Sequence, residues 1–495
     1  MRSLLIALVV LALVPTPVQS QTAKYVFAHY SVSTSNPAAQ EAFDQGLTFV
    51  YAFNRQAAEA AFRRAAGIDP HLAIAWWGVA LSRGPNINIS MTKDDMATAV
   101  EAIAKAKALE SEASPEERAL IEALTLRYAI GGDQDKLATP YANAMDKLAA
   151  ANPDDPDVEA LYLESRLDAL SFNFPTSRAA AWDSLGRRAT ADVDRWPTHI
   201  GMLHYFIHIT EPNESAFAVH VADTLASDAF APQASHLRHM PSHVYVHVGE
   251  WAKVMHLNDD AVHMDIAQAK EAGIQPSRLD YFFHNLYFWY GAAVMSGDEN
   301  AAEQAIDVWA PFNADMRWVV QVRFNHVQEA MRLIDQTKAS QHLGKMSLSA
   351  LLAYGLACSQ ASQTVQAQSA LTAIQHLKQS NAADLAADTL SASIAQQSGD
   401  AQKARELYLK ASYLMDKTDF EEAPPWSFYP RELLAELDLR AGDAAGAAEI
   451  AQADLYHHPN AVPVLQLLQI ADERLGKATD VQRISQELQQ LQATR

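Results

Sequence analysis

The chain has 495 residues, with 38 Lys and Arg against 59 Asp and Glu, and a formal net charge of −21 at pH 7. The acidic residues are spread along the chain, so a phosphate backbone or an anionic membrane surface would repel it. We therefore expect no nucleic-acid partner.

The amino terminus predicts export. The stretch MRSLLIALVVLALVPTPVQS has a basic start, an apolar run over residues 4–14 and small residues just before Gln21. This is the pattern of a cleaved secretory signal and is too short to span a bilayer. We predict a signal peptide at residues 1–20 and a periplasmic or secreted mature protein. No later stretch approaches the ~20 apolar residues of a membrane helix, so we expect no membrane insertion.

The first repeat follows directly. AAQEAFDQGLTFVYAFNRQAAEAAFRRAAGIDPHLAIAWWGVAL places Gly46, Ala58, Ala65 and Pro70 where a tetratricopeptide repeat (TPR) has its small residues and closing proline. The stretch resembles that family, whose antiparallel helix pairs of about 34 residues stack into a solenoid. Pro70 should end the second helix, because proline cannot continue one.

Comparable units recur as VHVGEWAKVMHLNDDAVHMD, YFWYGAAVMSGDENAAEQAI, SIAQQSGDAQKARELYLKAS and LDLRAGDAAGAAEIAQADLYHHP. Strand signals are almost absent, with no Asn-Gly or Asp-Gly turn between β-branched runs. We predict an all-α fold, one TPR-like α-solenoid over residues 21–495. Its histidine-rich groove spans about residues 195–295. The C-terminal repeats, about residues 346–490, supply mainly architecture, and Cys358 within them should be a buried small residue.

Histidines recur in register within WPTHIGMLHYFIHITE and HLRHMPSHVYVH. His204 and His208 are four residues apart, and so are His239 and His243, 35 residues later. On a helix this spacing stacks two side chains on one face, roughly 6 Å apart and within reach of one metal ion. Equivalent positions of consecutive repeats are therefore histidine.

Aligning Gly249 and Gly297 with the glycine that ends the first helix of a repeat adds two more positions. Histidines from three stacked helices should then converge on one concave groove, and these candidate metal ligands are His204, His208, His236, His239, His243 and His284. Asp280 should orient the ring of His284. Pro241 should kink the helix between His239 and His243, so that the pair could splay and serve two metals.

An imidazole-rich site with few carboxylates suits copper, zinc or iron rather than magnesium or calcium. Six histidines could hold two ions with three each, as in coupled dicopper sites that activate oxygen. Three or four could instead hold one zinc ion for hydrolysis. We favour copper, then zinc or iron, and redox chemistry on an organic substrate, because no carboxylate is placed as an obvious general base. Glu211, three residues after His208, is the nearest candidate.

The combination of HYFIH, HLRHMPSHVY and FFHN with an exported repeat array is similar to a set of bacterial TPR-containing proteins. That resemblance implies the fold and specifies no reaction. Two alternatives remain open: a periplasmic scaffold whose groove binds a peptide or an envelope protein, and a metal-handling protein without catalysis. RGPNIN (83–88) could contact a ligand at the groove rim, and PPWSFYPRE (424–432) could form a lid or a structural turn.

Overall fold

The computed structural model describes residues 28–129, 131–170, 179–211, 218–227, 234–377, 380–417 and 427–494. Every extended regular element in these ranges is a helix, and the β-type pairing among them is an isolated bridge between Asn86 and Ile89. The prediction of an all-α solenoid of stacked helical hairpins is confirmed. The predicted signal peptide at residues 1–20 lies outside the described residues.

The helices follow one another with short connections. The N-terminal ones are α1 (Pro37–Tyr51), α2 (Arg55–Ile68), α3 (Ala73–Ser82), α4 (Lys93–Ala108), α5 (Pro115–Thr125), α6 (Gln134–Ala151), α7 (Pro156–Leu170) and α8 (Ala179–Arg195). The central ones are α9 (Ile200–Thr210), α10 (Val219–Leu225), α11 (Ser235–His239), α12 (Ser242–Val248), α13 (Trp251–Ala272) and α14 (Phe282–Ser296). The C-terminal ones are α15 (Glu299–Trp309), α16 (Met316–Arg323), α17 (Val327–Thr337), α18 (Leu348–Gln360), α19 (Thr364–Gln375), α20 (Asn381–Gln397), α21 (Ala401–Met415), α22 (Pro430–Ala441), α23 (Ala444–His457), α24 (Val462–Arg474) and α25 (Ala478–Ala493).

Small residues let the first helices pack closely. Phe62 of α2 is fully buried, and a Cβ atom placed on Gly46 of α1 or on Gly78 of α3 would collide with its ring. Helix α2 ends at Ile68, two residues before Pro70, as the sequence predicts. Consecutive helices pack as hairpins, and each hairpin packs on the next, which is the arrangement of a solenoid.

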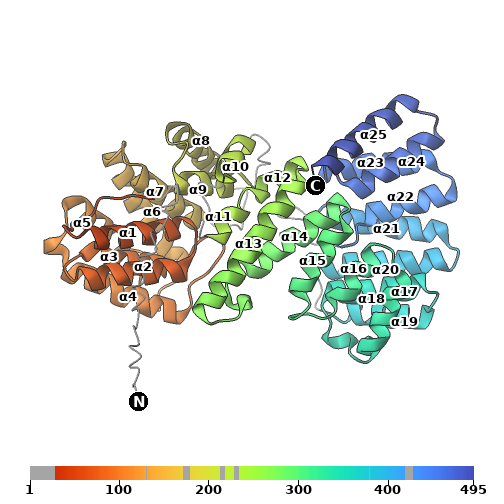
Figure 1. The fold of residues 1–495 in the computed structure, drawn as a ribbon, viewed down its shortest axis with the longest axis horizontal. Helices are drawn as coiled ribbons and strands as arrows, with labels where there is room; N and C mark the ends of the chain where they lie inside the picture. The colour runs from red at the N-terminus through yellow and green to blue at the C-terminus, as the bar shows by residue number, and fades with distance from the viewer. Residues whose placement is uncertain are drawn as a thin grey trace, which may run out of the picture.

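The helices that carry the six histidines lie in the middle of the molecule (Figure 1). Helix α1 reaches this region by packing against α9, and α24 returns to it by packing against α14. The indole nitrogen of Trp251 donates to the carbonyl of Pro459 at 2.8 Å, which ties the C-terminal repeats to the start of α13. Among the helices described, none combines the length and apolarity needed to cross a bilayer.

Candidate metal centre

Helix α9 presents the first histidine pair. Its N-cap is His199, whose ring accepts a hydrogen bond from the backbone N–H of Met202. Every residue of α9 is buried, so its polar side chains point into the protein rather than into solvent. The rings of His204 and His208 lie 4.9 Å apart between centroids, as expected for a spacing of four.

The second pair is carried by a broken helix. Helix α11 ends at His239 and α12 begins at Ser242, so the helix is interrupted at Met240 and Pro241. The two side chains nevertheless do not splay, because the Nε2 atoms of His239 and His243 are only 2.8 Å apart. The expectation that the bend would divide this pair between two metals is wrong.

The six histidines form two groups of three. The first histidine triad is His204, His208 and His236; the second is His239, His243 and His284. Within each triad one ring nitrogen from every residue lies within 4.8 Å of the others. The dividing line therefore falls between His236 and His239, and α14 completes the second triad.

The closest nitrogens suit a shared ion. The Nε2 atoms of His204 and His236 are 3.2 Å apart, and those of His284 and His239 are 2.9 Å apart. Two nitrogens bound at about 2.0–2.1 Å to one tetrahedral ion lie roughly 3.3 Å apart. The His204–His236 pair of the first triad already has this spacing, and the two close pairs of the second triad would open by a few tenths of an ångström.

The two triads are neighbours. The ring centroids of His208 and His243 are 6.1 Å apart, and those of His236 and His239 are 5.9 Å apart. Two ions held by these triads would therefore belong to one binuclear centre.

The centre is enclosed. Five of the six histidines are buried, and only His284 is partly exposed. The sequence predicts that these residues line a concave groove; in the structure five of the six side chains are buried, with α1 packed against α9 and α13 packed against α11 and α12. Burial lowers the pKa of His204, His236 and His239 well below the usual value and lowers that of His284 to about 3, so the rings are neutral at pH 7.

Each triad is covered by one phenylalanine. The ring centroid of Phe288 lies 4.5–5.0 Å from the ring centroids of the second triad. That of Phe53 lies 4.6–5.7 Å from the ring centroids of the first triad. Phe53 has a backbone φ of +52°, a left-handed conformation that costs a bulky residue energy. The strain is the kind that accumulates at functional sites.

Acceptors fix the orientation of the rings. The Nδ1 atom of His204 donates to the carbonyl of Tyr51 at 2.6 Å, and that of His239 donates to Asn258 Oδ1 at 2.6 Å. Asn258 cannot be reversed, because its amide nitrogen already donates to Ser242 Oγ and to the carbonyl of Val254, each at 2.7 Å. With the proton on Nδ1, the Nε2 atom of each neutral ring keeps its lone pair for a metal.

Glu211 is hydrogen-bonded to a histidine of the second triad and lies close to one of the first. Its Oε1 accepts from His243 Nδ1 at 2.5 Å, and its Oε2 lies 3.9 Å from His208 Nδ1. Burial alone would raise the pKa of Glu211, but His243 and His208 outweigh that effect and lower it to about 2. A carboxylate engaged in this way is a poor general base. Glu211, the general-base candidate of the sequence analysis, instead accepts a hydrogen bond from a candidate metal ligand.

Asp280 does not take the expected place. It lies before α14 begins and lines a cavity beside His236 and Tyr281. No hydrogen bond joins it to His284 among the described contacts. The sequence missed Asn258, Glu211 and the Tyr51 carbonyl as partners of the histidines. Only Glu211 left a signal, through its spacing of three from His208.

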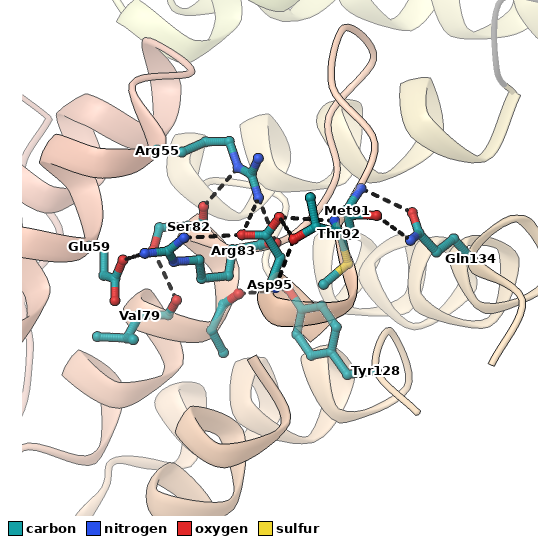
Figure 2. Close-up of polar contacts among 11 residues, drawn as sticks. Arg55, Glu59, Val79, Ser82, Arg83, Met91, Thr92, Asp95, Tyr128 and Gln134 are labelled. Carbon is teal, nitrogen blue, oxygen red and sulfur yellow. Dashed lines mark hydrogen bonds and ion pairs between the residues drawn. The ribbon is translucent and has the colours of Figure 1, made fainter. Parts of the chain in front are cut away.

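The RGPNIN loop is held by ion pairs rather than open for a ligand. Arg83 pairs with Glu59 and with Asp95, the latter at 3.1 Å, and Asp95 caps α4 together with Thr92 (Figure 2). The guanidinium of Arg83 is therefore already neutralised. The sequence-based suggestion that it contacts a ligand is not supported by this arrangement.

The same loop reaches the first triad through an aromatic ring. Asn88 Nδ2 donates to the hydroxyl of Tyr281 at 3.4 Å. The ring of Tyr281 stacks on that of His236 with centroids 3.9 Å apart. Tyr281 thus forms part of the wall of the first histidine triad.

The described part of PPWSFYPRE packs between helices as a structural turn. Ser427 Oγ lies 3.0 Å from the hydroxyl of Tyr290, and Arg323 donates to Glu432 at 2.6 Å. Residues 418–426 are outside the description. Cys358 is buried in α18, and burial raises the pKa of its thiol to about 11, so it is not an activated nucleophile.

No protein-family model and no curated protein matches the chain. Among solved structures it is similar to the APC/C hetero-tetramer Cut9–Hcn1, with 14% identity over 88% of this chain and 76% of that one and a TM-score of 0.32. It is also similar to the TPR domain of P58(IPK), with 12% identity, 89% and 99% coverage and a TM-score of 0.22. A third similar structure is yeast Tom70, with 12% identity over 89% of this chain and 96% of that one and a TM-score of 0.30. Similarities with such low identities and TM-scores indicate nothing about function.

Proposed function

We propose that the protein binds two transition-metal ions, one in each histidine triad, and acts as a metal-dependent oxidoreductase on a small organic substrate. The observation that supports this most is the approach of His239 Nε2 to His243 Nε2 at 2.8 Å. Asn258 and Glu211 accept from the Nδ1 atoms of these rings, so two lone pairs face each other. A cation between them removes the repulsion.

A proton is a poor substitute for the metal. Protonating His239 would place a charge in a buried site, and burial lowers the pKa of His239 well below its usual value. A metal ion instead binds the neutral imidazole and is shared by three ligands. The lone pairs are therefore arranged for a metal.

The ligand set favours copper, then zinc or iron. All six candidate ligands are imidazoles, which suit these metals, whereas magnesium and calcium require oxygen ligands. Adjacent triads allow two ions to act together, so that an organic substrate could lose two electrons while both ions are reduced by one. Zinc hydrolysis is less well supported, because Glu211 has a pKa of about 2 and already bonds to a ligand.

A peptide-docking role for the histidines is disfavoured by their burial, since a peptide in a groove could not reach five of the six rings. We also propose that the protein works in the periplasm or outside the cell. That proposal depends on the amino-terminal sequence alone.

Elemental analysis tests the metal proposal. Protein from metal-replete cells should carry two ions per chain, with His239→Ala losing the ion of the second triad and His204→Ala that of the first. His376→Ala is the matched control, because His376 is exposed and its ring bonds only to the carbonyl of Thr372. It should keep both ions. The proposal would be contradicted if native protein carried no copper, zinc or iron and if added metal did not raise its melting temperature.

Oxygen uptake tests the reaction. The copper-loaded protein should consume dioxygen in the presence of small organic reductants, and His239→Ala should abolish this. Two bound ions without turnover across a panel of phenols and amines would instead indicate a metal-handling protein.

A further inference from the structure

Helix α11 is short and needs its neighbours to hold it. It spans only Ser235–His239, and no side chain caps its N-terminus. Its far end is tied to α13 by the ion pair of Arg238 with Asp260 at 2.6 Å. Within the described part of the chain, Nδ1 of His236 makes no hydrogen bond. The position of this ligand of the first triad therefore depends on the stacking of Tyr281 and on how α11 itself is held.

A buried carboxylate on α13 holds the start of α11. Ser235 Oγ donates to Asp265 Oδ1 at 2.5 Å, and Ser235 directly precedes His236. Asp265 lies seven residues after Asn258, the partner of His239, so the two side chains share one face of α13. Both of them reach α11 from that face.

The same carboxylate holds the start of α14. Asn285 Nδ2 donates to Asp265 Oδ2 at 2.8 Å, and Asn285 directly follows His284 of the second triad. The two oxygens of Asp265 are thus engaged by one residue beside each triad. The exposed fractions of Asp265, Ser235 and Asn285 are 2%, 7% and 0%, so water does not compete for these bonds.

The carboxylate keeps its charge while it accepts these bonds. Burial raises the pKa of Asp265 to about 6, and the hydrogen bonds from Ser235 and Asn285 act in the opposite direction. At pH 7 the group is therefore mostly ionised and accepts from both donors. Hydrogen bonds to a charged acceptor are roughly twice as strong as neutral ones. One side chain thus makes two strong bonds to two different helices.

We propose that Asp265 is a positioning residue that fixes the start of α11 against the start of α14 and thereby sets the distance between the two histidine triads. It acts through Ser235 and Asn285, which are the chain neighbours of one ligand in each triad. Helix α13, which carries Asp265, packs against both α11 and α14 (Figure 1). The inference rests on the proposed metal centre, because this distance matters when both triads hold an ion.

Metal affinities test the proposal when each ion is measured alone. The His239→Ala background keeps only the ion of the first triad, and the His204→Ala background keeps only that of the second. Asp265→Ala should raise both dissociation constants about tenfold, near the lower end of the change for residues that support metal ligands. Ser235→Ala should weaken mainly the first ion. Asn285→Leu, which keeps the volume but removes the donor, should weaken mainly the second.

A conservative variant and a matched control complete the test. Asp265→Asn should bind both ions nearly as the unchanged protein does, because its amide oxygen accepts from Asn285 and its NH₂ group can donate to Ser235 Oγ. Glu271→Ala removes an exposed carboxylate from the same helix and should change nothing. Ser235→Ala and Asn285→Leu decide the matter if Asp265→Ala does not fold. Unchanged affinities, or equal weakening of both ions by each single change, would overturn the proposal.

Hydrogen exchange in the metal-free protein separates the anchoring from metal binding. Asp265→Ala should speed the exchange of amides in α11 and in the first turns of α14 severalfold, whereas Asp265→Asn should not. Unchanged exchange in Asp265→Ala would overturn the proposal. A protein that shows the expected exchange but binds no metal would refute the proposed function alone.

Discussion

Replacing Glu211 by Gln should weaken the binding of both metal ions. When Nε2 of a neutral histidine binds a metal, its Nδ1 carries the proton. The carboxylate of Glu211 can accept from His243 at 2.5 Å and faces His208 at 3.9 Å. An amide has only one accepting oxygen, so its NH₂ group would face one of the two Nδ1–H donors.

The size of the effect follows from these contacts. Changing the charged acceptor to a neutral one costs about 1 kcal/mol at His243. At His208, whose Nδ1 lies 3.9 Å from Glu211 without a hydrogen bond, the change removes the attraction of the carboxylate. Groups that support metal ligands typically change metal affinity by about 10–100-fold. We expect each dissociation constant to rise by about tenfold or more.

Competition with a chelator of known affinity measures the two constants. Asn258→Ala is the matched comparison, because Asn258 supports only His239 of the second triad. It should weaken one ion and leave the other unchanged. If Glu211→Gln keeps both affinities, or weakens only the ion of the second triad, then Glu211 does not support both triads as described.

Two further predictions concern the rest of the chain. Phe53 has a φ of +52°, whereas the buried Phe43 lies within α1. Phe53→Gly should therefore be more stable than Phe53→Ala by about 1 kcal/mol, whereas at Phe43 alanine should be the more stable substitution. Chemical denaturation of the four variants measures this, and the same order at both positions would contradict it. Mass spectrometry of the exported protein should find residues 1–20 missing and Gln21 first, and a cytoplasmic protein with an intact amino terminus would count against export.

The fold and the candidate ligands could be anticipated because both leave periodic signals. A repeat such as that around Gly46 and Pro70 specifies a helical hairpin, and stacked hairpins specify a solenoid. Histidines spaced by four within a helix and by 35 between repeats must lie close in such a stack. The division into triads was not predictable, because it depends on how the chain bends at Pro241 and how α14 crosses α12.

The partners of the histidines leave almost no signal. His204 donates to the backbone carbonyl of Tyr51, and a carbonyl is present at every position whatever the side chain. Asn258 lies on α13, one of many polar residues there, and only the packing of α13 on α11 selects it. Asp280 looked suitable at a spacing of four from His284, but it precedes the helix, so the helical spacing does not apply.

Phe53 combines a left-handed backbone with close contacts to the first triad. Its ring lies against the rings of all three histidines of that triad. A strained backbone persists only where the surroundings hold it, and here the imidazoles on one side hold the ring in place.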